Sequence, residues 1–379
     1  MKVTVVGAGI VGCSLAQSLV ALGHTVSLVD PHEPGSGTTG TSFAWINSHK
    51  KHPLSYHELN LRGVETWSTT VAARYPHTVY IGGHVEVAES ATHRESLRAR
   101  VARLTSLNYP AEIIDVATAR ALTPVTTSDD AIVARFPSEG HAYPVEYCEA
   151  VLAELAQSPL FTLHLGRVSG ITANTATVAM SNGEMLEADA VVICAGTATA
   201  ALAELAGAPL PLVPEDADGP AFGYLAIVDA PGHGLTGLIT TDEVNLRPDG
   251  PCRVIAQVLD LDGTADPMVS PPDDLATTIG ARVAVVLPRT TIGTVDVRVG
   301  HRVIPADGLT TAGPLIGSVW AIATHSGVVL GPWLGAVIAA EMDGGDPNPL
   351  LADFRPARFS TSSPVIPSSL VAPRRPGDQ

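Results

Sequence analysis

The hydrophobic pattern at the start of the chain predicts a strand, a helix and a second strand. Residues 2–6 (KVTVV) are an apolar run rich in β-branched residues that ends at a glycine, which is typical of a buried parallel strand. Apolar residues then recur at helical spacing over 10–22, and Gly23 ends that helix. Residues 25–29 (TVSLV) predict a strand that leads to Asp30. The chain therefore opens with a βαβ unit.

Helical and strand patterns alternate along the rest of the chain. Further helices are predicted at 54–74, 94–107, 144–156, near 273–286 and at 328–342. Strands are predicted at 81–88, 160–168, 170–180, 189–194, 222–228, 243–246, 253–258, 294–299 and 319–324, with a hairpin turn at 181–183. Those between 221 and 300 predict a separate, mostly antiparallel sheet with one helix. Residues 31–53 are too long for an ordinary connection, so we expect a functional loop there.

Composition narrows the class of protein. The 379 residues are 45% hydrophobic and 16% charged, enough for a two-domain chain or one large α/β domain with an insertion. Lys+Arg 22 against Asp+Glu 38 gives a net charge of −16 without a basic run, which argues against a nucleic-acid partner. The four cysteines form no C-x-x-C pair, so neither a disulfide framework nor a metal site is expected. No apolar run reaches a membrane-spanning length of about 18 residues, and glycines interrupt the N-terminal one, so we expect a cytoplasmic protein without membrane attachment.

A G-x-G-x-x-G motif lies between the first strand and the first helix. Gly7 permits a tight turn, Gly9 lets the backbone approach a pyrophosphate, and Gly12 lets the helix pack closely on the strand. The N–H groups and the dipole at the start of the helix favour phosphate. Asp30 is the acidic residue expected on the ribose hydroxyls. This unit predicts a dinucleotide, and both NAD and FAD satisfy it.

A later strand favours FAD. Residues 188–196 (ADAVVICAG) are an apolar strand that ends in Ala-Gly and follows a hairpin over 178–185. Two-domain flavoproteins return to the nucleotide domain with such a strand, whose small residues let the backbone pass close to the cofactor. A buried strand of this kind is common by itself, but together with the opening unit it favours FAD over NAD.

Three C-terminal segments carry a family resemblance: 300–308 (GHRVIPADG), 313–317 (GPLIG) and 324–328 (THSGV). With them the chain resembles the D-amino-acid-oxidase-like flavoproteins, which include glycine oxidase and monomeric sarcosine oxidase, over about residues 1–360. Val303 and Thr324 depart from the family pattern, which has proline and glycine there.

The resemblance implies an α/β fold of the glutathione-reductase-like flavoprotein architecture. A Rossmann-like FAD-binding domain would come from 1–80, 145–220 and 300–360. A mostly antiparallel substrate domain would come from 81–144 and 221–299, with a flexible tail at 364–379. Residues 296–306 contain no cysteine at the position that some relatives use for covalent attachment, so we expect non-covalent FAD.

The resemblance also implies roles for single residues. Arg302 would grip a substrate carboxylate, with Arg247 a weaker candidate, and Asn47 would face the site beside Ser48. His325 is either a site residue or a packing residue of its turn. The segment 49–52 (HKKH) is expected to be a solvated loop. The predicted FAD contacts are Gly7, Gly9, Ile10, Val11, Gly12, Asp30, Pro31, Thr41, Ser42, Val168, Ala195, Gly196, Ser326, Gly327 and Val328.

The reaction implied by the resemblance is oxidation of a C–N bond in a small amino acid or secondary amine. A hydride would pass from the substrate carbon to flavin N5, leaving an imine, and O2 would take the electrons to give H2O2. Four alternatives stay open: a dehydrogenase that uses another acceptor, a tailoring oxidase for a specialised biosynthetic intermediate, an NAD-linked dehydrogenase, and a non-catalytic flavin-binding module. The sequence leaves open the substrate and the oligomeric state.

Overall fold

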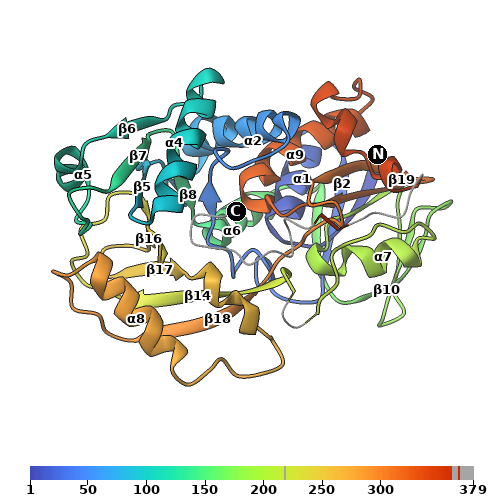
Figure 1. The fold of residues 1–379 in the computed structure, drawn as a ribbon. Coiled ribbons are helices and arrows are strands. Elements are labelled where there is room, and N and C mark those ends of the chain that lie inside the picture. Colours follow the sequence, from blue (N-terminus) through green and yellow to red (C-terminus); the bar gives the residue numbers. More distant parts are fainter. Residues whose placement is uncertain (217–218, 361–365, 368–379) are drawn as a thin grey trace.

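Two sheets of different kinds organise the molecule (Figure 1). The computed structural model describes residues 1–216, 219–360 and 366–367. The tail expected at 364–379 lies, apart from 366 and 367, outside the described residues. The fold is α/β, with a Rossmann-like parallel sheet in one half and a mostly antiparallel sheet in the other. Among the described helices, none is both long and apolar enough to cross a membrane.

The parallel sheet has six strands in the order β19–β20–β13–β1–β2–β9. These are β19 (Thr311–Ile316), β20 (Val319–Ala323), β13 (Ala190–Ile193), β1 (Lys2–Val6), β2 (Thr25–Asp30) and β9 (Phe161–Leu165). All neighbours pair in parallel except β19, which pairs antiparallel with β20. The predicted strands at 2–6, 25–29, 189–194 and 319–324 are therefore confirmed. β19 was not predicted, because its sequence TAGPLI carries a glycine and a proline.

Both faces of this sheet are covered, which explains its continuous apolar strands. Val192 packs with α1 (Ile10–Ala21) and α9 (Gly327–Met342), whereas its neighbour Val191 packs with α7 (Thr199–Leu205) on the opposite face. The small sheet β10 (Val168–Thr172), β11 (Thr177–Met180) and β12 (Met185–Glu187) covers the α7 face too. Successive side chains of a strand point to opposite faces, so a doubly covered strand is apolar throughout.

The hairpin region differs from its prediction. The strand expected over 170–180 is divided into β10 and β11, which pair antiparallel through a turn where Ala176 has a φ of +48°. The strand expected over 160–168 ends at Leu165. The turn at 181–183 lies between β11 and β12, as predicted.

Helices α1 and α9 lie side by side through a close approach at Gly335. A Cβ atom added to Gly335 would stand 2.6 Å from the Ser14 carbonyl carbon and 2.8 Å from the Leu15 nitrogen. Both are backbone atoms, which cannot rotate away. We therefore expect Gly335→Val to lower the free energy of unfolding by about 1–3 kcal/mol, the usual cost of overpacking. Urea unfolding measures this, with Gly263→Ala as the control, because a Cβ at Gly263 meets no described atom within 4 Å. An unchanged urea midpoint for Gly335→Val would contradict the packing argument.

The second half contains an eight-stranded sheet in the order β18–β14–β17–β16–β15–β5–β7–β6. Its strands are β18 (Val295–His301), β14 (Phe222–Asp229), β17 (Arg253–Gln257), β16 (Asn245–Pro248), β15 (Leu238–Thr240), β5 (His84–Ala88), β7 (Ile132–Phe136) and β6 (Glu112–Ile114). Pairing is antiparallel except between β15 and β5. The predicted sheet at 221–300 is thus extended by three strands from 84–136. The strand expected at 243–246 is found two residues later, as β16 (Asn245–Pro248).

Helices cover this sheet at two places. α8 (Leu275–Val286) places Leu275, Ile279 and Val283 against β14 and β17, one helical turn apart. α4 (Ala91–Ser106) packs on β7 and begins earlier than the predicted residue 94, because the Ser90 hydroxyl caps it by accepting from the His93 N–H. The other helices are α2 (Leu54–Thr66), α3 (Ala72–Arg74), α5 (Val116–Leu122) and α6 (Pro144–Leu155), with a π-helical turn at Trp67–Val71.

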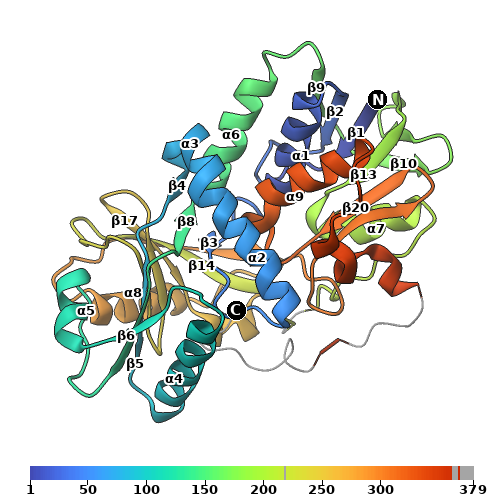
Figure 2. The same cartoon turned by 90° about the horizontal axis from the view of Figure 1, so that it is seen from above.

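A small three-stranded sheet lies between the two halves (Figure 2). It contains β3 (Trp45–Ile46), β8 (Gly140–Ala142) and β4 (Val79–Tyr80), with β8 in the centre. β3 belongs to the long segment 31–53, which was expected to be a functional loop. Pairing of β3 with β8 holds part of that segment in this small sheet.

Candidate active site

The turn between β1 and α1 needs glycine at two positions for packing reasons alone. Gly7 has a φ of +108°, and a Cβ there would lie 2.4 Å from the carbonyl oxygen of Cys194 at the end of β13. A Cβ on Gly12 would lie 1.8 Å from the Gly7 carbonyl oxygen. Both contacts are with backbone atoms. The turn is therefore built against the strand that ends in Ala195 and Gly196.

Gly9 differs, because the space around it is open. Within 4 Å an added Cβ would meet one described atom, Thr39 Oγ1, at 3.1 Å. Gly9 is the N-terminal cap of α1, so the N–H groups of Ile10 and Val11 lie in the first helical turn, where helical acceptors are lacking; the Ile10 N–H donates instead to Thr39 Oγ1 at 3.1 Å. An open backbone surface at a helix N-terminus suits a pyrophosphate. The residues present thus fit the phosphate part of FAD.

Asp30 stands at the end of β2 beside this turn. Its Oδ2 accepts a hydrogen bond from the Ala8 N–H at 2.7 Å, and Oδ1 accepts from the His32 N–H at 2.9 Å. A carboxylate has further lone pairs, so it can still accept from ribose hydroxyls. The Gly166 N–H donates to the Asp30 carbonyl at 2.8 Å, which brings the start of β10 at Val168 to the same edge. Pro31 follows as an exposed residue.

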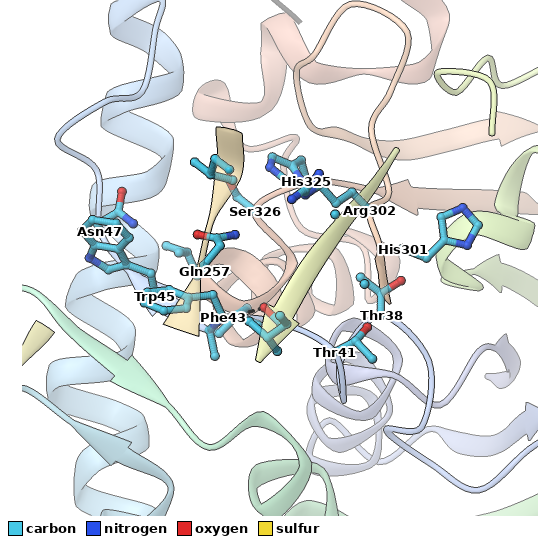
Figure 3. Close-up of a pocket in the computed structure, with 18 of the residues that line it drawn as sticks. Thr38, Thr41, Phe43, Trp45, Asn47, Gln257, His301, Arg302, His325 and Ser326 are labelled. Atoms are coloured by element: carbon cyan, nitrogen blue, oxygen red, sulfur yellow. Dashed lines mark hydrogen bonds between the residues drawn. The ribbon is translucent and has the colours of Figure 1, made fainter. Parts of the chain in front are cut away.

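A pocket with about 830 Å³ of empty space, open to solvent, lies where the two halves meet (Figure 3). Thr38 and Thr41 lie at one end of the view and Asn47 at the other. Ser42, Trp45, Gln257, Arg302, His325, Ser326 and Val328 also line it. Its walls come from segment 31–53, the sheet strands β14 and β17, and the start of α9. The cavity therefore extends from segment 31–53 to strands of the eight-stranded sheet, at the junction where ligand pockets commonly form.

The start of α9 is held at the pocket by hydroxyl groups. Ser326, the N-terminal cap, is hydrogen-bonded through its hydroxyl to the Tyr56 hydroxyl at 2.9 Å. The Ser326 N–H donates to Thr324 Oγ1 at 3.0 Å, and Thr324 Oγ1 is 2.6 Å from Thr310 Oγ1. The following residues, Gly327 and Val328, start the helix, where N–H groups lack helical partners and the dipole is positive. This end of the helix favours negative charge in the pocket.

Arg302 lines the pocket, but its guanidinium is bound to protein groups. Nη2 donates to Asp262 Oδ2 at 2.6 Å, and Nη1 donates to the carbonyl oxygens of Phe222 and Pro220. The group lies over Gly223, where an added Cβ would be 2.0 Å from Nη2. Its predicted contact with a substrate carboxylate stays a prediction, and these bonds use three of the five guanidinium N–H groups.

Arg247 supports the wall of the pocket and does not line the pocket itself. It is buried, its Nε donates to the Phe43 carbonyl at 2.7 Å, and the described lining does not include it. Ala44, with a φ of +60°, accepts at its carbonyl from the Ala142 N–H at 2.9 Å. The Trp45 indole N–H donates to Glu139 Oε2 at 3.0 Å. The wall formed by residues 43–45 is thus fixed on several sides before any ligand binds.

Glu139 is the centre of a buried network behind Trp45. Its carboxylate lies 2.7 Å from His49 Nδ1 and 3.2 Å from His84 Nδ1, and it accepts from the Tyr109 hydroxyl at 2.6 Å. These neighbours outweigh burial and lower the pKa of Glu139 to about 2. Burial lowers the pKa of His49 to about 4, even with Glu139 beside it. The network is therefore an ionised carboxylate held by hydrogen-bond donors.

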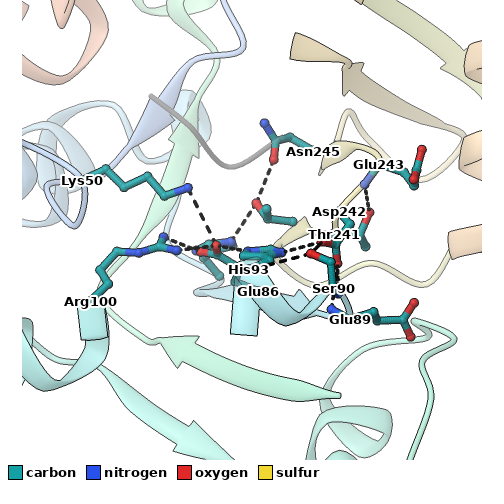
Figure 4. A network of polar contacts seen from close by, with 12 residues as sticks. Lys50, Glu86, Glu89, Ser90, His93, Arg100, Thr241, Asp242, Glu243 and Asn245 are labelled. Carbon is teal, nitrogen blue, oxygen red and sulfur yellow. Dashed lines mark hydrogen bonds and ion pairs between the residues drawn. The ribbon is translucent and has the colours of Figure 1, made fainter. Parts of the chain in front are cut away.

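The segment 49–52 is not the solvated loop that its charges indicate. His49 and Lys51 are buried, and only His52 is exposed among the four residues. Lys50 lies 3.7 Å from Glu86, a fully buried carboxylate that also binds Arg100 and His93 (Figure 4). Lys51 lines the pocket. The buried acid of β5 accounts for part of this correction, since Glu86 pairs with Lys50, whereas Lys51 is enclosed by the pocket wall with Glu139 as a more distant charge.

The other predicted site residues divide into two groups. Asn47 is buried and His325 exposed, and both line the pocket. Ser48 does not face it: its hydroxyl lies 2.9 Å from His57 Nδ1 and donates to the His57 carbonyl. Sequence reasoning did not select Lys51, Tyr56, Gln257 or Glu139 for the site. The available signal was the lysine pair at 50 and 51, two of the three lysines in the chain.

Known proteins share both the sequence pattern and the fold. The family model described as FAD dependent oxidoreductase matches residues 2–341. The tRNA 5-methylaminomethyl-2-thiouridine biosynthesis bifunctional protein MnmC of Nitrosospira multiformis is 28% identical over 267 residues, covering 64% of this chain and 37% of that protein. The chain thus spans little more than a third of this curated relative.

Solved structures match over nearly the whole chain. Glycine oxidase from Geobacillus kaustophilus superposes with a TM-score of 0.81 at 20% identity, covering 94% of this chain and 99% of that one. L-proline dehydrogenase from P. horikoshii gives 0.80 at 18% identity, covering 95% and 97%. Iminodiacetate oxidase from Chelativorans sp. BNC1 gives 0.77 at 20% identity, covering 93% and 98%. The family match extends over most of the chain, and the glycine turn and the pocket fit the cofactor in its name: the chain belongs to the FAD dependent oxidoreductase family.

Proposed function

We propose that this protein oxidises a C–N bond of a small amino acid or secondary amine. The observation that carries the proposal is the pocket at the junction of the two halves, which joins a helix N-terminus to a wall of buried polar side chains. The matched structures named for glycine, proline and iminodiacetate place this chemistry on the same fold. We assign 1–80, 145–220 and 300–360 to the FAD-binding domain, and 81–144 and 221–299 to the substrate domain.

The cofactor is FAD, which supplies a hydride acceptor when bound, and we propose that it is bound without a covalent link. Gly9, Ile10 and Val11 would hold its pyrophosphate, with the Ile10 N–H exchanging Thr39 Oγ1 for the ligand, and Asp30 would hold its ribose. The N–H groups of Gly327 and Val328 would stabilise negative charge, because they lack helical acceptors.

The substrate side of the pocket needs little acid–base chemistry. We propose that Asn47 and His325 orient the substrate by hydrogen bonding and that the buried wall around Trp45 excludes water. Orientation and desolvation supply most of the rate enhancement for a hydride transfer of this kind. We propose O2 as the acceptor, with H2O2 as its product. A non-oxygen acceptor is the second candidate, favoured by the match to L-proline dehydrogenase.

The test is a visible spectrum of the purified protein followed by anaerobic titration with amino acids and N-methyl amines. We expect flavin absorbance that one class of these compounds bleaches, and recovery of colour with H2O2 release on admitting air. Colour that returns only with an added quinone would favour the non-oxygen acceptor. A flavin spectrum that no compound bleaches would contradict the proposed reaction and leave the cofactor in place.

A further inference from the structure

Lys51 is a buried cation at the pocket wall. Only 8% of its surface is exposed, and it lines the pocket together with Asn47 and Gln257. No hydrogen bond or ion pair joins its ammonium to any residue that the structure describes. It is one of three lysines in the chain, and its neighbour Lys50 is paired with Glu86. Glu139 and Tyr56 act on this ammonium electrostatically without a hydrogen bond or ion pair, so the buried charge lacks a close partner and its position favours an anionic ligand.

The two cations that line the pocket, Arg302 and Lys51, differ in how far protein groups already bind them. The Arg302 guanidinium already binds Asp262 and two carbonyl oxygens. An anion that binds Arg302 would share the guanidinium with a carboxylate at 2.6 Å that already offsets its charge, whereas an anion that binds Lys51 meets an ammonium without a close partner. Asn47 and Gln257, both largely buried, add amide groups to the same pocket.

We propose that the Lys51 ammonium binds the carboxylate of the substrate, so that α-amino acids and their N-substituted forms are the substrate class and simple amines are not. This inference rests on the proposed function and concerns the same pocket. It assigns to Lys51 the contact that the family resemblance implies for Arg302.

The charge balance agrees with this assignment. An amino acid whose amine is neutral, the form that can lose a hydride, carries one negative charge on its carboxylate. Lys51 carries one positive charge, so the two cancel in the pocket. Burial lowers the pKa of Lys51, and a bound carboxylate would restore it, because an opposite charge favours the charged form. A simple amine would leave Lys51 with only the electrostatic influence of Glu139 and Tyr56, which form no ion pair with it.

The test measures binding of methoxyacetate, a carboxylate with an ether oxygen in place of the amine nitrogen, so that it is not oxidised there. Titration of the FAD-loaded protein with methoxyacetate would perturb the flavin spectrum and give a Kd. We expect Lys51→Met to raise this Kd at least about 10-fold, the loss expected for one charge-assisted hydrogen bond. Lys50→Met is the matched control and should change the Kd less than twofold. Lys51→Gln serves if the methionine variant does not fold.

Three outcomes would overturn the inference. One is a Kd for Lys51→Met equal to that of the parent protein. The second is a folded, FAD-loaded parent that does not bind methoxyacetate at all. The third is loss of binding in Arg302→Lys with retention in Lys51→Met, which would return the carboxylate to Arg302. Lys51-dependent binding in a protein that no amine reduces would instead support the anion site while contradicting the proposed oxidation. The two failures are therefore distinguishable.

Discussion

Replacing Gly9 with alanine is expected to weaken FAD binding strongly and to leave the protein folded. The added Cβ would meet only Thr39 Oγ1 among described atoms, at 3.1 Å, so the apoprotein accommodates it with a small shift of one side chain. In the complex, the same methyl group would occupy the surface at which the backbone approaches the pyrophosphate. We expect the affinity for FAD to fall at least about 100-fold, since the loss includes both the close approach and the N–H contacts behind it.

Absorbance of the purified variant and titration of its apoprotein with FAD measure the affinity, and urea unfolding of apoproteins measures stability. Gly12→Ala is the contrasting variant, because its Cβ would stand 1.8 Å from the Gly7 carbonyl oxygen and should destabilise the fold itself. Gly37→Ala is the neutral control, since a Cβ there meets no described atom within 4 Å. A Gly9→Ala protein that purifies with a full complement of FAD would refute the assignment of this turn to the pyrophosphate.

Stability is expected to fall steeply as the pH drops from 6.5 to 4.5. Burial lowers the pKa of His49 to about 4 and that of His141 to about 3. Both pKa values are lower in the folded than in the unfolded chain, where 6.5 is usual, so below 6.5 the unfolded state takes up the protons first. Each histidine should lower the free energy of unfolding by about 1.4 kcal/mol for each pH unit in this window. Together they would remove about 5 kcal/mol over two units, comparable to the whole stability of many domains.

Glu139 extends the loss to lower pH. Its pKa is lowered to about 2, so its contribution is complete above the usual carboxyl pKa of 4.5 and is lost as the pH falls from there toward 2. Acid should therefore destabilise the protein through the histidines first and through this carboxylate afterwards.

Urea unfolding between pH 7 and 4.5 measures the slope. His141→Gln should reduce it by about 1.4 kcal/mol per pH unit, because no described residue hydrogen-bonds to either ring nitrogen of His141 and its neutral form is buried. His77→Gln, at an exposed position, is the control and should leave the slope unchanged. A slope that stays the same in His141→Gln would show that this ring takes up its proton equally in both states.

The local parts of the nucleotide turn could be predicted from the sequence because their causes are local. A run such as KVTVV followed by a glycine and a helical repeat specifies strand, turn and helix within about thirty residues. Gly7 and Gly12 are required by contacts of the turn with itself and with β13, and the small residues that end β13 were visible in the sequence too. The hydrophobic pattern also indicated the second sheet, whose α8 repeats its apolar residues at each turn.

Membership of that second sheet was decided by tertiary structure. β5, β7 and β6 come from residues 84–136 and join strands of 221–300 through the parallel pairing of β5 with β15. Pairing between such distant segments leaves no periodic signal in either one, so the hydrophobic pattern predicts each strand at best and not its neighbour.

The sequence by itself thus determined the βαβ unit, the glycine turn, the acidic end of β2 and the family to which these belong. Only the tertiary structure decided which charges are buried and which partners they have. Ser326 and Tyr56 are hydrogen-bonded at the pocket although they are 270 positions apart in the sequence. Arg302 is hydrogen-bonded to Asp262, which lies 40 positions away. The sequence around Lys51 indicates a lysine in solvent, but the fold buries it in the pocket wall. The physical reason is that the state of a charge depends on its desolvation and on its counter-ions, and both are supplied by residues far away in the sequence.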